Sequence, residues 1–205
     1  MRKLKVPLEK PEPNFSEFKD VLSGKKPAQK VHFAELFADI EVIFYITENI
    51  LGNKVIHSPQ EDFPGFWKQE INFWYKMGYD YIRVAGGLNF PQLKGRVAED
   101  TALLSRGERS WIEETTGVIS SWRDCEEYPW PTRESFDYSH YEFISRNLPQ
   151  GMKMMICPTS GVFEISSEYL LGFEGMSYLL YEDYKLVKSV FDRVGEIIYE
   201  FYENI

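Results

Sequence analysis

Helix-like and strand-like segments alternate along the middle of the chain, and this alternation restricts the fold more than any other feature. Apolar and aromatic residues recur every three or four positions from Phe63 to Trp74, and the pattern ends at Gly78. That spacing predicts an amphipathic helix that begins between Ser58 and Phe63. Residues 79–85 then form a short run of aromatic and branched side chains, which is typical of a strand. A helix followed at once by a strand indicates an α/β fold with a parallel sheet.

Similar patterns predict the remaining elements on both sides of this helix–strand pair. Three prolines among charged residues make 1–14 an extended arm. Two β-like runs around Thr115–Gly117 predict a hairpin over residues 111–122, as an excursion from the main sheet. The other predicted elements are strands at 30–37 and 152–157 and helices at 15–22, 39–51, 133–147, 163–171, 175–181 and 183–205.

The charge balance argues against two classes of partner. The 205 residues include 23 basic and 32 acidic side chains, which give a net charge of −9. Such an acidic chain repels nucleic-acid phosphates and anionic lipid headgroups, so we expect neither nucleic acid nor a membrane as a partner. No apolar run approaches the ~20 residues that cross a bilayer, and none follows the basic N-terminus as in a signal peptide.

The cysteine usage indicates a reducing compartment. Cys125 and Cys157 are the two cysteines of the chain, and their separation does not form a CxxC pair. Two reduced thiols are the simpler interpretation, with a single disulfide between them as the alternative. We therefore expect a cytoplasmic protein.

The C-terminal third of the chain carries a family resemblance. Residues 161–175, with the sequence GVFEISSEYLLGFEG, resemble the uroporphyrinogen decarboxylase superfamily, as do Leu179–Asp183 and Leu186-Val187. The segments Gly78–Tyr81 and Tyr128–Pro131 agree with this resemblance. The order and spacing of these segments are most similar to the branch that contains the cobalamin- and corrinoid-dependent methyltransferases.

The resemblance implies a (β/α)₈ barrel, a fold that typically needs ~250 residues. It extends over residues 15–205, which would be the N-terminal part of such a barrel with three of its strands, preceded by the arm 1–14. Family members are longer than this chain. We therefore expect a partial TIM barrel, inactive alone, whose exposed sheet edge pairs with a complementary C-terminal half or with a second copy.

The active site of a parallel barrel lies at the C-terminal ends of its strands, and this rule selects the first candidate residues. They are the ligand-binding residue His32 and the catalytic residue Glu35 beside the first strand, and Arg83, Gly86 and Gly87 at the second. Arg83 would bind an anion if it faces inward, or pair with a helix carboxylate if it faces outward. The two glycines allow either close approach of a ligand or a plain turn.

Two further candidates follow the third strand. Glu164 lies near the strand end and is a candidate general acid, whereas Tyr169 falls where the resemblance implies a substrate-binding tyrosine. Both residues also have a structural alternative. Tyr169 could pack in the core, and Glu164 could cap a helix start, where an anion is stabilised.

The function that the resemblance implies is methyl transfer, with a small molecule or a corrinoid protein as the substrate. That branch uses a corrinoid methyl carrier and a zinc ion whose His and Cys ligands lie in the C-terminal half. The histidines and cysteines of this chain are scattered without ligand-like spacing, so we expect no metal site within it.

Two alternatives remain open at this point. In the decarboxylases, a pair of arginines near the first strand and an aspartate after the second strand bind the substrate. Here residues 31–39 contain no arginine, and Gly86-Gly87 replaces the aspartate, which disfavours decarboxylation of uroporphyrinogen. Decarboxylation in tetrapyrrole biosynthesis is therefore one alternative, and a non-catalytic barrel fragment that pairs with a partner or with itself is the other.

Overall fold

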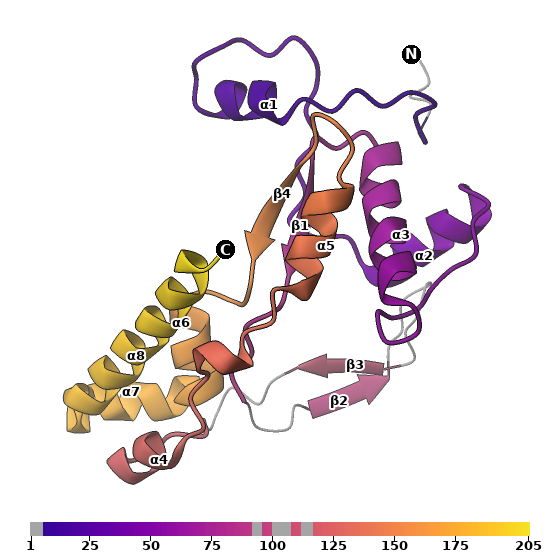
Figure 1. Ribbon diagram of the computed structural model, residues 1–205. Coiled ribbons are helices and arrows are strands. Elements are labelled where there is room, and N and C mark those ends of the chain that lie inside the picture. Colours follow the sequence, from indigo (N-terminus) through magenta and orange to yellow (C-terminus); the bar gives the residue numbers. More distant parts are fainter. Residues whose placement is uncertain (1–5, 92–95, 100–107, 112–116) are drawn as a thin grey trace. The chain divides into compact units, whose positions relative to one another are not determined.

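The chain divides into two compact units (Figure 1). This computed structural model describes residues 6–91, 96–99, 108–111 and 117–205. The first unit consists of the chain up to Ala85 together with Ser139–Cys157, and the second consists of Gly86–Tyr138 and Pro158–Ile205.

Helices alternate with parallel strands in the first unit. Its elements are α1 (Phe15–Leu22), α2 (Ile40–Asn49), α3 (Phe63–Lys76), β1 (Tyr81–Ala85), α5 (Ser139–Asn147) and β4 (Lys153–Cys157). The strands β1 and β4 pair in parallel, with Tyr81 opposite Lys153 and Ala85 opposite Cys157 (Figure 1). α3 leads into β1, α5 leads into β4, and the two helices contact each other. The α/β class that the sequence predicted is therefore confirmed.

The start of α3 is fixed by a side chain that precedes the helix and accepts a hydrogen bond from one of its first backbone amides. Asp62 is its N-cap, and the Asp62 carboxylate accepts a hydrogen bond of 3.0 Å from the amide of Gly65. The buried face of α3 contacts β1, in which Ile82 and Val84 are each 1% exposed. Burial of one such side chain contributes about 1.5–3 kcal/mol, so this contact holds the centre of the unit together.

The described part of the N-terminal arm, residues 6–14, contains neither helix nor strand. It is attached to the C-terminal end of α3. The amide of Leu8 donates to the carbonyl of Lys76 over 2.8 Å, and the hydroxyl of Tyr75 donates to the carbonyl of Pro11 over 3.3 Å.

The prediction of a first strand at residues 30–37 is wrong. Its apolar alternation resembles a strand, but a neighbouring side chain rather than another strand takes up its backbone groups. The amide of Glu35 donates to the hydroxyl of Tyr81, and the same hydroxyl donates to the carbonyl of Glu35, over 3.0 and 2.9 Å. Because Lys30 and His32 also bond to Asp80, the segment is held through side chains and has no strand geometry.

The second unit contains an antiparallel pair of strands and several helices. Its elements are β2 (Arg96–Glu99), β3 (Glu108–Trp111), α4 (Trp122–Glu127), the 3₁₀ helix η1 (Arg133–Ser135), α6 (Val162–Glu164), the π-helix η2 (Ile165–Leu170), α7 (Phe173–Glu182) and α8 (Tyr184–Glu203). α8 is the helix predicted from Asp183 onward, and the Asp183 carboxylate accepts from the amide of Leu186. One face of α8, which includes Val190 and Val194, is fully buried.

The prediction of a hairpin over residues 111–122 is wrong, and the antiparallel pair of the described residues lies earlier in the sequence. Its strands are β2 and β3, not segments on either side of residue 116. Residues 112–116 lie outside the described residues. The predicted second arm, residues 118–122, is not a strand, because Ile119 donates its amide to the carbonyl of Leu170 and Ser121 caps α4.

Two other predicted helices are divided. The segment 133–147 forms η1 and α5, separated by an irregular stretch in which the amide of Asp137 donates to the carbonyl of Gly87 over 2.9 Å. The segment 163–171 forms α6 and then a π-helical turn. A π-helical turn is a rare element that is found frequently at functional sites.

Candidate functional site

The seven candidate residues from the sequence fall into both units. His32, Glu35 and Arg83 belong to the first unit, and Gly86, Gly87, Glu164 and Tyr169 belong to the second.

His32 lies in a buried polar cluster at the N-terminal end of β1. Its side chain is 5% exposed, and its Nδ1 atom is 2.5 Å from Oδ2 of Asp80, the residue that precedes the strand. Asp80 also accepts hydrogen bonds from Nζ of Lys30 over 2.8 Å and from the amide of Asn14 over 2.6 Å. On the other side of the imidazole, Nε2 is 3.8 Å from Oε1 of Glu17.

These contacts compensate the buried charge of Asp80. Burial raises the pKa of the Asp80 carboxyl, but the hydrogen bonds from Lys30, from the Asn14 amide and from His32 together hold it below its usual value. In parallel α/β sheets, ligands bind at the C-terminal ends of the strands, and this cluster lies at the opposite end of β1. We therefore assign this cluster, including His32, a structural role that ties the segment before α2 to β1.

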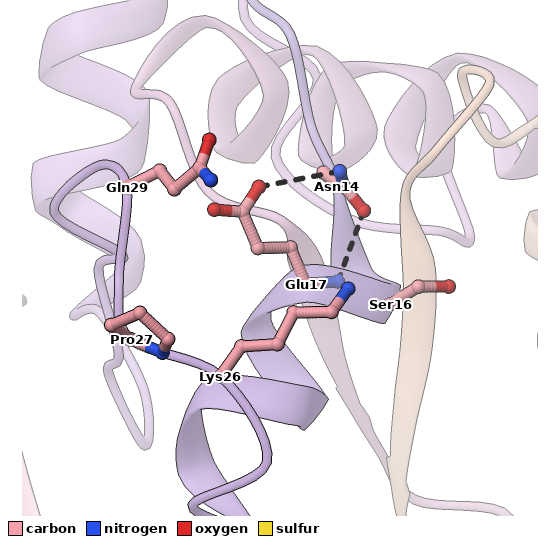
Figure 2. Close-up of a pocket in the computed structure, with 6 residues that line it drawn as sticks. All are labelled: Asn14, Ser16, Glu17, Lys26, Pro27 and Gln29. Atoms are coloured by element: carbon pink, nitrogen blue, oxygen red, sulfur yellow. Dashed lines mark hydrogen bonds between the residues drawn. The ribbon is translucent and has the colours of Figure 1, made fainter.

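A polar recess of about 410 Å³ adjoins this cluster (Figure 2). Figure 2 shows that Glu17 and Asn14 are joined by two hydrogen bonds. The backbone amide of Glu17 donates to Oδ1 of Asn14, and the side-chain amide of Asn14 donates to the Glu17 carboxylate. Ser16 points away from the Glu17 carboxylate in this view. Lys26, which lines the recess, forms an ion pair of 2.9 Å with Asp20.

Glu35 is exposed and lines an apolar groove of about 340 Å³ whose walls include Phe33, Phe73 and Tyr79. Burial raises the pKa of Tyr79, and the nearby carboxylate of Glu35 raises it further. The groove contains few polar groups besides this carboxylate. The backbone of Glu35, in contrast, is joined to β1 through its two hydrogen bonds with the hydroxyl of Tyr81.

A second hollow, of about 190 Å³, lies where the active site of a parallel α/β fold is expected, at the C-terminal end of β1. Arg83 and Ala85 of β1 line it, together with residues of the segment before α2, of α2 and of α3. The guanidinium of Arg83 donates to Sγ of Cys157 over 3.4 Å. A thiol is a weak acceptor, so this contact leaves most of the donors of Arg83 available.

Glu70 faces the same hollow, and sequence reasoning missed it. Its side chain lies on the buried face of α3 and is 8% exposed. Burial raises the pKa of Glu70 to about 7, although a hydrogen bond from the side chain of Trp74 acts in the opposite direction. The Oε1 atom of Glu70 is buried and has no hydrogen-bond partner among the described residues. Near neutral pH, Glu70 can therefore hold or release a proton.

Trp67, one turn before Glu70 on the same helix, also lines the hollow. Its ring stacks on His140 at a centroid distance of 5.4 Å, which fixes the orientation of the indole. The indole N–H is buried and has no hydrogen-bond partner among the described residues. The sequence could have indicated Glu70 as a candidate. It is the one ionisable residue in the helical spacing Phe66, Glu70, Trp74, which is otherwise apolar.

In the second unit, Gly86 and Gly87 form a left-handed turn directly after β1. Their φ angles are +94° and +90°, in a region that other residues rarely adopt. The carbonyl of Gly87 accepts from the amide of Asp137. The backbone conformation alone therefore accounts for both glycines, in agreement with the plain-turn alternative.

Glu164 and Tyr169 lie in the segment after β4. A Cβ atom on Gly161, the N-cap of α6, would be 2.5 Å from Oε2 of Glu164, so this carboxylate folds back over the start of its own helix. That position matches the structural alternative for Glu164. Tyr169 lies on the π-helix η2, and its hydroxyl is 3.3 Å from Oγ of Ser160.

Among residues 6–91 and 117–205, no three His, Cys, Asp or Glu side chains gather in a way that could hold a metal ion. The part of the chain that the structure describes also contains no helix that is both long and apolar enough to span a lipid bilayer.

Comparison of the chain with profiles of known protein families, with curated proteins and with solved structures finds no match.

Proposed function

We propose that this chain is part of a (β/α)₈ barrel of the uroporphyrinogen decarboxylase type, and that the complete protein transfers a methyl group between a corrinoid carrier and an acceptor. The observation that carries the proposal is the position of the Arg83–Glu70 hollow at the C-terminal end of β1. Active sites of such barrels occupy this end of the strands. The parallel pairing of β1 with β4, each preceded by a helix, supports the same fold.

The residues of this chain would bind and orient a substrate in the proposed reaction. Arg83 would hold an anionic group of the substrate, and Glu70 would hold or release a proton beside it. The corrinoid would supply a transferable methyl group. A hollow of about 190 Å³ is too small to enclose a tetrapyrrole ring, so in this proposal the carrier stays outside it.

The zinc ion that the resemblance implies does not fit the described residues, because they contain no group of suitable ligands. We therefore assign no step to zinc in this chain. In the proposal, any zinc ligands come from outside the described residues. A cytoplasmic location is part of the same proposal, since it keeps Cys125 and Cys157 reduced.

A second candidate function, decarboxylation of a tetrapyrrole, is favoured by one observation. Arg83 faces the hollow and has no carboxylate within ion-pair distance among the described residues, so it could bind a substrate carboxylate.

A third candidate is a non-catalytic fragment that pairs with a complementary half or with itself. The edge of β4 opposite β1 has no paired strand among the described residues, which favours that reading.

Equilibrium dialysis and one assay separate the three candidates. The purified chain is dialysed against methylcobalamin, whose retention is measured by absorbance, and is incubated separately with uroporphyrinogen. Retention of methylcobalamin without formation of coproporphyrinogen is the expected result. Formation of coproporphyrinogen would instead assign the chain to decarboxylation. If neither occurs, the methyl-transfer proposal is wrong for this chain, and gel filtration then tests for self-pairing.

A further inference from the structure

We propose that the hollow at the C-terminal end of β1 binds the carboxylate group of a small aliphatic acid, held by Arg83, Trp67 and Glu70. This inference builds on the proposed function, because it names the class of substrate group that the same hollow takes. It is tested by binding alone, so it can fail or succeed independently of methyl transfer.

Two residues that line the hollow carry hydrogen-bond donors that the described residues leave unused. Arg83 is bonded to the thiol of Cys157, which occupies one of its five N–H donors. The indole N–H of Trp67 is buried without a partner among the described residues. Buried polar groups are nearly always satisfied in folded proteins by protein atoms, water or a ligand, so an unsatisfied donor on a residue that lines a cavity is open to a further partner.

The charges in the hollow select an anion over a cation. Arg83 carries a permanent positive charge, which would repel an ammonium group. Glu70 is mostly surrounded by apolar side chains, and its burial favours the protonated form, in which the carboxyl group donates one hydrogen bond. A carboxylate has two oxygens and about four acceptor positions, which is enough for Arg83, Trp67 and the Glu70 hydroxyl together.

The size and lining of the hollow restrict the rest of the ligand. Its volume is about 190 Å³, and an apolar cavity of ~150 Å³ accommodates a benzene molecule. Apolar side chains from three segments line the remainder, including Leu36, Ile40, Ile43 and Phe66. A carboxylate with an unbranched tail of three or four carbons therefore fits both the polar end and the apolar walls.

Three probes of equal length test the choice of ligand. Butyrate, butylammonium and 1-butanol are titrated into the protein, and binding is followed by isothermal titration calorimetry at pH 6.5. We expect saturable binding of butyrate, at least about tenfold tighter than that of either other probe, because one strong ionic hydrogen bond contributes a factor of this size. Equal binding of butyrate and butylammonium would refute the proposal.

Three substitutions test the residues. Arg83→Met should weaken butyrate binding about tenfold or more, whereas Arg83→Lys should restore part of it because it keeps the charge. Arg146→Met is the matched control, since Arg146 is an exposed arginine of α5 in the same unit and pairs with Glu142 on the same helix. Circular dichroism confirms that each variant is folded. Wild-type affinity in a folded Arg83→Met protein would overturn the assignment.

The same carboxylate chemistry could belong to a free acid or to a side arm of a larger ring, so uroporphyrin serves as a competitor. Displacement of butyrate by uroporphyrin identifies a side arm as the source, and lack of displacement identifies a free acid. Butyrate binding without methylcobalamin retention would support this inference and refute methyl transfer. Methylcobalamin retention without butyrate binding would support methyl transfer and refute this inference.

Discussion

Replacement of Glu70 by glutamine should stabilise the protein at alkaline pH and not at acidic pH. The reference pKa of the Glu70 carboxyl is 4.5, and burial in the folded protein raises it to about 7. The folded state therefore binds a proton that the unfolded state has already lost between these two pH values. Raising the pH through this window favours unfolding, because the unfolded state binds fewer protons.

The magnitude follows from the same two pKa values. A tenfold change in proton affinity corresponds to ~1.4 kcal/mol, so full ionisation of Glu70 destabilises the folded state by about 3 kcal/mol. This penalty is absent below about pH 4.5, grows as the pH rises to about 7, and is constant above that. Glutamine has nearly the same shape and never ionises. The Glu70→Gln variant should therefore gain about 3 kcal/mol over the wild type between pH 4.5 and pH 8.

Urea denaturation of both proteins at pH 4.5, 6 and 8 measures this gain. Protection of the α3 amides from hydrogen exchange localises it to the first unit. Glu48→Gln is the control, since Glu48 is an exposed glutamate on α2. Its stability relative to the wild type should not change across the same pH range. A Glu70→Gln stability difference that is equal at pH 4.5 and pH 8 would refute the argument, because ionisation of Glu70 would then carry no cost.

Three further substitutions test other parts of the two units. Asp80→Asn should destabilise the first unit by ~3 kcal/mol in urea denaturation, because it removes the buried carboxylate that accepts hydrogen bonds from Lys30 and the Asn14 amide. The Asp20→Asn variant is the control, since Asp20 is partly exposed, and it should have little effect. Tyr81→Phe should lower stability by ~1 kcal/mol and speed hydrogen exchange at Glu35, and unchanged exchange would contradict the bridging role of the hydroxyl. Ile197→Ala, in the buried face of α8, should cost ~3 kcal/mol, and a loss below ~1 kcal/mol would argue against that packing.

The elements that the sequence predicted well are those in which periodicity and end signals agree. In α8, apolar residues recur with helical spacing and Asp183 provides the N-cap, so both the position and the buried face of the helix were predictable. The same holds for α3 and the strand that follows it. In these segments the local sequence pattern and the tertiary contacts favour the same structure.

The incorrect predictions have a common physical cause. Residues 30–37 alternate like a strand, but the hydroxyl of Tyr81 takes up the backbone groups of Glu35, and a sequence pattern cannot indicate such a distant contact. In the same way, Ile119 donates its amide to Leu170, fifty-one positions away, and not across a local hairpin. Short β-like runs acquire their structure from their hydrogen-bond partners, and long-range partners are not visible in a single sequence.

The site was only partly predictable for a different reason. The rule that function lies at the C-terminal ends of strands selected Arg83, which does line the hollow. Glu70 was overlooked because it lies within a helix whose apolar residues carried the prediction. An ionisable residue in the middle of an apolar helix face should therefore be treated as a candidate in its own right.

Two buried carboxyl groups, one near each end of β1, have pKa values that are shifted in opposite directions. Asp80 receives hydrogen bonds from Lys30, from His32 and from a backbone amide, and its pKa is lowered. Glu70 receives a hydrogen bond from Trp74, and its pKa is raised. A leucine or glutamine at position 70 would remove that penalty, and such stabilising substitutions are common in proteins. The Oε1 atom of Glu70 has no hydrogen-bond partner among the described residues, and Glu70 lines the same hollow as Arg83, which is where we propose that a small carboxylate binds.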